Sequence, residues 1–106
     1  MSDILGVGLD VSATVAQGQE GLTQMPSTIG FMFVREDFYN GYCALWLFHA
    51  GDLRVIYEEN PATLSATSTS ARAYCTGQYT NNVSYIKIKN NYTGPVKIKY
   101  RFYSVK

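Results

Sequence analysis

Apolar and polar residues alternate most regularly near the C-terminal end of the chain. The apolar members of this alternation are Val96, Ile98, Tyr100 and Phe102, and lysine, arginine and tyrosine fill the positions between them. A strand points successive side chains to opposite faces, so this period of two predicts a strand with one buried and one solvated face. Residues 83–89 alternate in the same way. The Asn- and Gly-containing segment between the two runs predicts that they form a hairpin.

The middle of the chain predicts a meander of three strands. Residues 29–35 and 42–49 are rich in aromatic and aliphatic side chains, and residues 53–58 run back after the tight turn Ala50-Gly51-Asp52. The run at 42–49 is almost wholly apolar, which is typical of a central strand covered on both faces. Its Trp46 is therefore expected in the core.

The remaining segments complete an all-β pattern. Residues 72–79 predict one more strand, residues 62–71 a Ser/Thr-rich loop or irregular edge strand, and residues 4–11 a possible first strand. Six to eight short strands separated by turns indicate a small antiparallel β-sandwich or a barrel-like jelly roll. We place this domain at residues 29–106 and expect residues 1–28 to form an extended N-terminal arm.

Charge is unevenly distributed along the 106 residues, although the net charge is only +1. Residues 1–59 hold eight acids against two arginines, which gives −6, and residues 60–106 hold seven bases and no acid, which gives +7. A polarised surface of this kind suits a complementary partner, including a second copy of the chain. Alternatively, the two halves neutralise each other within one fold. The sequence leaves both interpretations open.

The candidate interface is the solvent face of the predicted C-terminal hairpin. Its members are cations and tyrosines, namely Tyr85, Lys87, Lys89, Tyr92, Lys97, Lys99, Arg101 and Tyr103. Basic strands with tyrosines can bind single-stranded nucleic acid. The nearly neutral net charge disfavours that function, and lysines on strands also protect sheet edges from aggregation.

No constellation of residues predicts a catalytic, cofactor or metal site. His49 is the single histidine, and no nucleophile motif accompanies it. The acid pairs Glu36-Asp37 and Glu58-Glu59 are adjacent in sequence, whereas a glycosidase needs carboxylates that face each other across a cleft. Cys43 and Cys75 are too few for a metal site and are expected as small buried hydrophobes. A bridge between them is an alternative if their strands face each other.

Membrane insertion and secretion are not expected. No apolar run approaches the roughly 20 residues that a spanning helix needs. The first residues carry an acid and no basic segment, so we expect no signal peptide and predict assembly in a cytoplasm.

The second half resembles the C-terminal β-domains of bacteriophage and prophage tail-fibre proteins. The similarity covers residues 42–103 and rests on the turn Ala50-Gly51-Asp52, the Ser/Thr-rich stretch 64–70, and the strand–Asn-x-Thr-Gly–strand segment 86–98. The resemblance implies a virion component that is usually trimeric and whose exposed loops can meet a host surface. It implies no catalytic residues.

The chain departs from that family because only residues 1–28 precede the core, whereas a fibre tip follows a long shaft. This favours a small virion protein, such as a head fibre or capsid decoration protein, whose arm docks on a capsid or tail protein. We predict a non-enzymatic phage structural protein that assembles in the host cytoplasm and forms a homo-oligomer, with a trimer favoured. The alternative is a stand-alone module that binds carbohydrate or another host-surface ligand.

Overall fold

The chain folds as a β-sandwich, as its alternation predicts. The structure is a computed structural model that describes residues 8–25 and 29–104. The described residues contain nine strands, where the sequence predicts six to eight. They are β1 (Gly8–Val15), β2 (Glu20–Gln24), β3 (Ile29–Glu36), β4 (Cys43–His49), β5 (Asp52–Glu58), β6 (Leu64–Ser65), β7 (Ala73–Thr80), β8 (Val83–Asn90) and β9 (Val96–Ser104).

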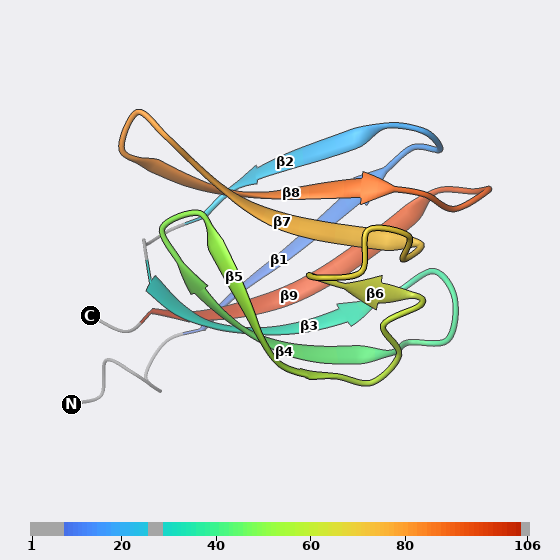
Figure 1. Ribbon diagram of the computed structural model, residues 1–106, viewed down its shortest axis with the longest axis horizontal. Coiled ribbons are helices and arrows are strands. Elements are labelled where there is room, and N and C mark those ends of the chain that lie inside the picture. The colour runs from blue at the N-terminus through green and yellow to red at the C-terminus, as the bar shows by residue number, and fades with distance from the viewer. Residues whose placement is uncertain (1–7, 26–28, 105–106) are drawn as a thin grey trace.

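Two sheets form the layers of the sandwich. The five-stranded sheet has the order β1-β9-β3-β4-β5, and the four-stranded sheet has the order β2-β8-β7-β6. Figure 1 shows β2, β8 and β7 above β9, β3 and β4. All neighbouring strands are antiparallel except β6 and β7, which are parallel.

The predicted meander is confirmed, since β3, β4 and β5 are consecutive neighbours in the five-stranded sheet. Ala50 and Gly51 join β4 to β5 with positive φ angles of 44° and 91°. Two consecutive residues with positive φ form a hairpin turn whose twist matches the right-handed twist of the strands on either side. Asn81 and Asn82 join β7 to β8 in the same way, with φ angles of 52° and 64°.

The predicted C-terminal hairpin is wrong. β8 pairs with β2 and β7, whereas β9 pairs with β1 and β3 in the other sheet. Asn90 fixes the crossing between the sheets, because its Nδ2 donates to the carbonyls of Val15 and Gly94, both at 2.9 Å. Its Oδ1 accepts from the Tyr92 N–H at 2.7 Å. The segment that looks like a hairpin turn is therefore a connection between layers.

Part of the predicted N-terminal arm belongs to the sandwich. β1 runs along β9 from Gly8 opposite Tyr103 to Val15 opposite Val96, and β2 runs along β8. Strand β2 forms where the sequence predicts a loop or an extended arm. The alternation of apolar and polar residues is weak in β2 because position 21 has no room for a side chain. A Cβ on Gly21 would lie 2.7 Å from Val15 Cγ2. Residues 1–7 and 26–28, including the start of the predicted first strand, lie outside the described residues.

The core lies between the two sheets and is filled by the inward side chains of the alternating strands. Its largest fully buried members include Trp46, Phe48, Phe102, Met32, Ile86, Ile88 and Ile98. Trp46 is thus a core residue, as predicted. Its Nε1 donates to Glu58 Oε2 at 2.8 Å, so the buried indole N–H has a partner.

The two cysteines are free thiols. Cys75 is buried, as expected, and burial together with the nearby Glu58 carboxylate raises the pKa of its thiol to about 12. Cys43 is exposed, because it occupies an outward position of β4. One thiol lies in the core and the other on the outer surface, so the alternative of a bridge between them is not realised.

Candidate functional site

The candidate interface residues do not form one surface. Tyr85, Lys87 and Lys89 belong to β8, whereas Lys97, Lys99, Arg101 and Tyr103 belong to β9 in the opposite sheet. The intervening residues of both strands are buried in the core. The two sets of cations consequently lie on opposite outer faces of the sandwich. Tyr92 lies in the connection between them.

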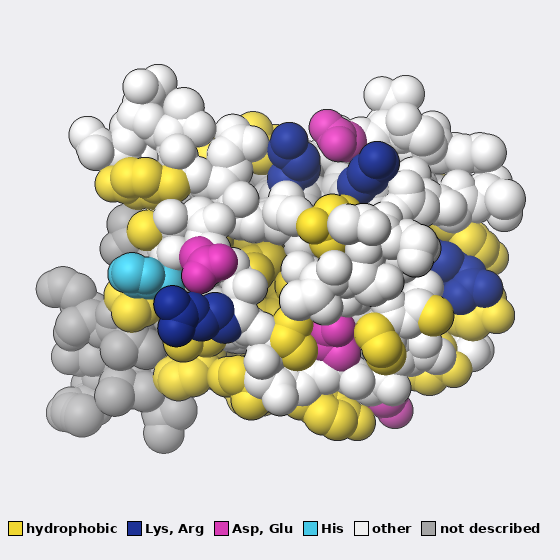
Figure 2. Space-filling model, in the orientation of Figure 1, with side chains coloured by type: hydrophobic (Ala, Val, Ile, Leu, Met, Phe, Trp, Pro, Cys, Tyr) yellow, Lys and Arg dark blue, Asp and Glu magenta, His cyan; other side chains and the backbone are white. Residues whose placement is uncertain are grey.

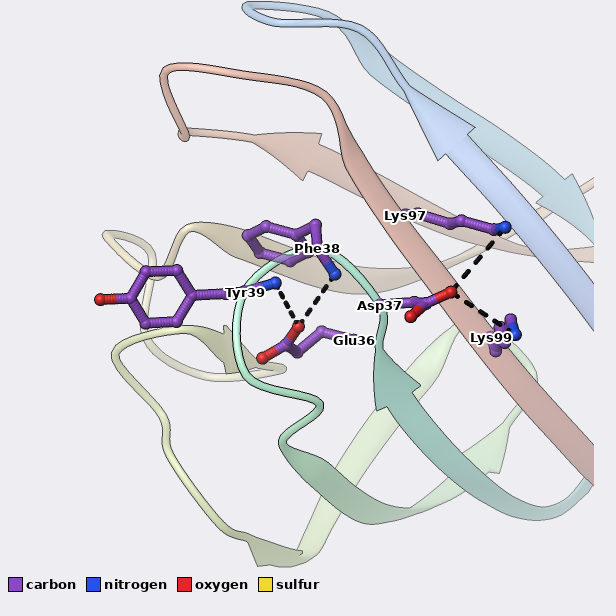
Figure 3. A network of polar contacts seen from close by, with 6 residues as sticks. All are labelled: Glu36, Asp37, Phe38, Tyr39, Lys97 and Lys99. Atoms are coloured by element: carbon purple, nitrogen blue, oxygen red, sulfur yellow. Dashed lines mark hydrogen bonds and ion pairs between the residues drawn. The ribbon is translucent and has the colours of Figure 1, made fainter.

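Acids from the first half of the chain lie beside several of these cations. Asp37 Oδ2 is 3.4 Å from Lys99 Nζ and 3.8 Å from Lys97 Nζ, and Figure 3 shows the carboxylate between the two lysines. Glu20 Oε1 is 4.0 Å from Lys87 Nζ. Each of these exposed pairs is worth about 0–1 kcal/mol. The acid-free second half is therefore not an unbroken basic surface, which weakens the nucleic-acid interpretation further.

The β3–β4 loop is folded around the buried carboxylate of Glu36. Its Oε1 accepts from the N–H groups of Phe38 and Tyr39 at 3.1 and 2.9 Å, and its Oε2 from those of Asn40 and Tyr42 at 2.9 and 3.1 Å. Burial alone would raise the pKa of Glu36, but the four backbone donors outweigh it and lower this pKa below 4.5. The adjacent Asp37 points outward to β9 (Figure 3).

The outer face of the five-stranded sheet carries apolar side chains over β3 and β4. We define the apolar face as the outward side chains of β3, β4 and β5 together with the last tyrosine of β9, namely Phe31, Phe33, Leu45, Leu47, Tyr57 and Tyr103. Phe33 is 53% exposed and Tyr57 is 58% exposed. Figure 2 shows hydrophobic side chains along the lower edge of the molecule, below β4.

This face corrects the expectation that the strand at 42–49 is covered on both sides. Ala44, Trp46 and Phe48 are buried, but the outward Leu45 and Leu47 are only half-buried. In an antiparallel sandwich each sheet buries one face against the other and leaves its second face at the surface. The apolar side chains on that second face of β4 are thus unusual and need an explanation.

Strand register arranges the apolar face in rows across the sheet. One row joins Arg101, Phe33, Leu45 and Tyr57, and the next joins Tyr103, Phe31, Leu47 and Arg54. Phe33 also contacts Tyr103 edge-on, with ring centroids 5.7 Å apart. Side chains on β3 and β4 are therefore bordered by cations on β9 and by polar or aromatic residues on β5.

The sequence does not predict this surface as the interface, because the predicted interface was based on the lysines of the C-terminal strands. A signal was present in the chain. Residues 31–34 and 44–48 are unbroken apolar runs. In a sheet with one solvated face such runs must place apolar side chains outside.

A second cluster lies at one end of the sandwich, where three loops meet (Figure 1). The guanidinium carbon of Arg72 lies 4.4 Å from the ring centroid of Tyr39 and 5.9 Å from that of Tyr92. Phe38 packs on Tyr92 with centroids 5.2 Å apart. Arg72 Nη1 also donates to Thr63 Oγ1 at 3.2 Å. These contacts hold the loops together and present Tyr39, which is 46% exposed, to solvent.

The residues considered for catalysis serve other contacts. His49 is exposed at the end of β4, with Asp52 as its register partner on β5. Glu58 accepts hydrogen bonds from Trp46, from the Ser65 hydroxyl at 2.9 Å and from the Ala66 N–H at 2.7 Å, so its carboxylate joins β5 to the segment around β6. Within residues 8–25 and 29–104 no group of three or more His, Cys, Asp or Glu residues could hold a metal ion. The same described segments include no helix long and apolar enough to cross a membrane.

Comparisons of the chain with known protein families, with curated proteins and with solved structures give no match. The resemblance to tail-fibre domains therefore rests on the residues quoted for it and stays a prediction.

Proposed function

We propose that this protein is a non-enzymatic structural domain that works by self-association and by docking on a larger assembly. The observation that carries this proposal is the apolar face. Isolated apolar residues on a surface are normal, but a contiguous apolar patch marks an interaction site. The resemblance of residues 42–103 to tail-fibre domains points to a bacteriophage virion as the assembly, with a fibre-type, head-fibre or capsid decoration role.

The composition of the apolar face supports association with protein. Aromatic side chains and arginine are enriched at protein interfaces, whereas lysine and acids are depleted from their centres. Phe33 and Tyr57 lie at the centre and β5 side of the face, and the charged residues lie around it. This arrangement of an apolar centre within a polar rim suits burial against a flat partner.

Substitution of Phe33 tests the proposal. Phe33→Ser should raise the dissociation constant for self-association about tenfold or more, since central aromatic residues dominate interface energies. Sedimentation velocity over a wide range of protein concentration measures this change. A matched control is Leu22→Ser, because Leu22 is 52% exposed on β2 of the other sheet. Equal association of wild type and both variants would contradict the proposed function.

A second candidate function is binding of a carbohydrate on a host surface. It is favoured by the loop cluster, which we define as Tyr39, Arg72 and Tyr92 at one end of the sandwich. The cluster offers exposed aromatic surface on Tyr39 and Tyr92 and hydrogen-bond donors on Arg72. Hydrogen bonds to the side chains of Glu36 and Asn90 hold the loops that carry the two tyrosines. Rigid aromatic platforms with a few polar groups are typical of ligand sites.

This candidate predicts saturable glycan binding that depends on Tyr39. If a glycan array identifies a ligand, Tyr39→Ala should weaken its binding by about tenfold or more. The control is Tyr79→Ala, because Tyr79 is 47% exposed on β7 beside the β7–β8 turn. Loss of binding in both variants, or in neither, would exclude the loop cluster as the site.

A further inference from the structure

We infer that the apolar face is covered by a second copy of this chain, in a two-fold dimer whose axis runs along the strands. This inference rests on the proposed function, because it names the partner and the geometry of the same surface. It replaces the trimer implied by the tail-fibre resemblance with a closed pair of sandwiches.

The two sides of the apolar face carry different residues. On the β9 side it carries Lys99 and Arg101, and Arg35 on β3 is the register partner of Lys99. On the other side, the Glu59 N–H donates to the Cys43 carbonyl at 3.0 Å, which continues the row of Lys99 and Arg35 beyond β4. Glu59 is exposed, and its Oε1 accepts a hydrogen bond from the Cys43 N–H at 3.0 Å within the same chain. Tyr57 follows along the same side. The β9 flank of the apolar centre thus carries Lys99 beside Asp37, and Arg101 with Asp10 of β1 as its register partner. The β5 flank carries Glu59, Tyr57 and Arg54.

The five-stranded sheet can stack on a second copy of itself with two-fold symmetry in two ways. If the axis lies in the interface and runs across the strands, each strand lies over its own copy. The β9 cations would then face the same cations of the partner, and like charges in contact disfavour that arrangement. If the axis runs along the strands and lies between β3 and β4, β9 of one copy lies over β5 of the other.

The second arrangement matches each row with a complementary one. Lys99 faces Glu59 of the other copy, which pairs opposite charges. Arg101 faces Tyr57 of the other copy, where a guanidinium can stack on the ring. At the centre Phe33 meets Leu45. Aligned packing of two sheets brings their side chains together at a sheet spacing of about 10 Å, as it does inside a sandwich.

The ion pair of Lys99 with Asp37 is compatible with this contact. The lysine ammonium has three donors. It lies 3.4 Å from Asp37 within its own copy, so Glu59 of the second copy would extend the pair to a network. Both carboxylates lie on the rim of the apolar face, where water still solvates them.

Charge reversal tests the geometry. Lys99→Glu alone places two acids together at each of the two symmetric contacts, and Glu59→Lys alone places two bases together. We expect each variant to raise the dimer dissociation constant about tenfold, as two rim pairs turn from attractive to repulsive. An equimolar mixture of the two variants restores both contacts, and its heterodimer should bind within about threefold of wild type by the same estimate. Sedimentation equilibrium gives all three constants.

Each outcome decides the inference. Weakened single variants with a restored mixture support it. Single variants that match wild type, with a mixture tighter than wild type, would show an axis across the strands and overturn it. A mixture as weak as its components would overturn the inference while leaving the proposed function intact, provided that Phe33→Ser still weakens self-association. A strict monomer whose behaviour is unchanged by Phe33→Ser would overturn both.

A measurement on the wild-type chain guards against local effects of the substitutions. A carbodiimide joins a lysine amine directly to a carboxylate that touches it. In a mixture of isotopically light and heavy protein, mass spectrometry should find Lys99 joined to Glu59 in peptides that contain one light and one heavy partner. A Lys99–Asp37 product alone, within single chains, would contradict the dimer.

Discussion

Glu36 organises the β3–β4 loop with a single carboxylate that accepts four backbone hydrogen bonds. An ionised carboxylate has only acceptor sites, so it can satisfy several N–H groups that turn inward in a tight loop. The buried carboxylate thereby replaces the backbone acceptors that a regular turn would supply. The neighbouring Asp37 is free to reach the β9 lysines. Two adjacent acids have opposite orientations and different roles.

Replacement of Glu36 by glutamine should lower the free energy of unfolding by about 2–3 kcal/mol. The side-chain amide presents N–H donors at one of the two positions where the carboxylate accepted, so two part-buried backbone N–H groups lose their acceptor. Urea unfolding at neutral pH measures the loss. The control Asp37→Asn removes only exposed ion pairs and should cost no more than about 1 kcal/mol. A similar small loss in both variants would contradict the structural role of Glu36.

The lowered pKa of Glu36 also predicts a particular loss of stability in acid. Because the unfolded chain takes up this proton near pH 4.5 and the folded chain only at lower pH, the contribution is complete above pH 4.5. It is lost as the pH falls through the folded pKa. The free energy of unfolding of the wild type should therefore fall more steeply below pH 4.5 than that of Glu36→Gln. Parallel curves for the two proteins would rule out this linkage.

At the scale of elements, the connections that cross between the sheets decide the fold. β1 and β2 lie in different sheets although only residues 16–19 separate them, and β8 and β9 are divided in the same way. At the second crossing, Asn90 links the β8 end to the Val15 carbonyl on β1 and to the Gly94 carbonyl. One amide side chain thus ties both crossings together at the same end of the sandwich.

Asn90→Ala should lower the free energy of unfolding by about 2–3 kcal/mol, since it leaves the Val15 carbonyl and the Tyr92 N–H without their side-chain partner. Hydrogen exchange should show that the lost protection is greatest at the ends of β1 and β9. The control Asn40→Ala removes an exposed bond from Asn40 Nδ2 to the Tyr42 hydroxyl and should change stability by less than about 0.5 kcal/mol. Equal effects of the two substitutions would show that Asn90 does not direct the crossing.

Local patterns predicted the elements well where the pairing itself is local. The β3–β4–β5 meander was predicted because the Ala50-Gly51 turn joins neighbouring strands with the backbone twist that a hairpin requires. The β8–β9 hairpin was wrong because its alternation is equally consistent with a strand in either sheet. What decides between them is the long-range contact of Asn90 with Val15, which no local pattern reveals.

At the scale of the whole molecule, the segregation of charge along the sequence is largely undone in space. Glu20 and Asp37 from the acidic half lie beside lysines from the basic half. The interpretation that the halves neutralise each other is therefore supported for these cations. The candidate site was only partly predictable, because β9 contributes its cations to the flank of the apolar face while β8 lies on the far side. The apolar centre was visible as unbroken runs, but only the sheet topology shows which face they occupy.

The pairing of β1 with β9 sets the order in which the sandwich can be completed. Gly8 is opposite Tyr103, so β1, the first described strand, can pair only after β9, the last strand, is available. Contacts between residues so distant in sequence slow folding, because the chain loses the entropy of loop closure before the contact repays it. During synthesis, β3, β4 and β5 can pair as soon as they leave the ribosome, whereas β1 must wait until residues 96–104 have emerged. The partly folded chain thus exposes the β3 edge that β9 later covers, and this interval is when it is most open to misassociation.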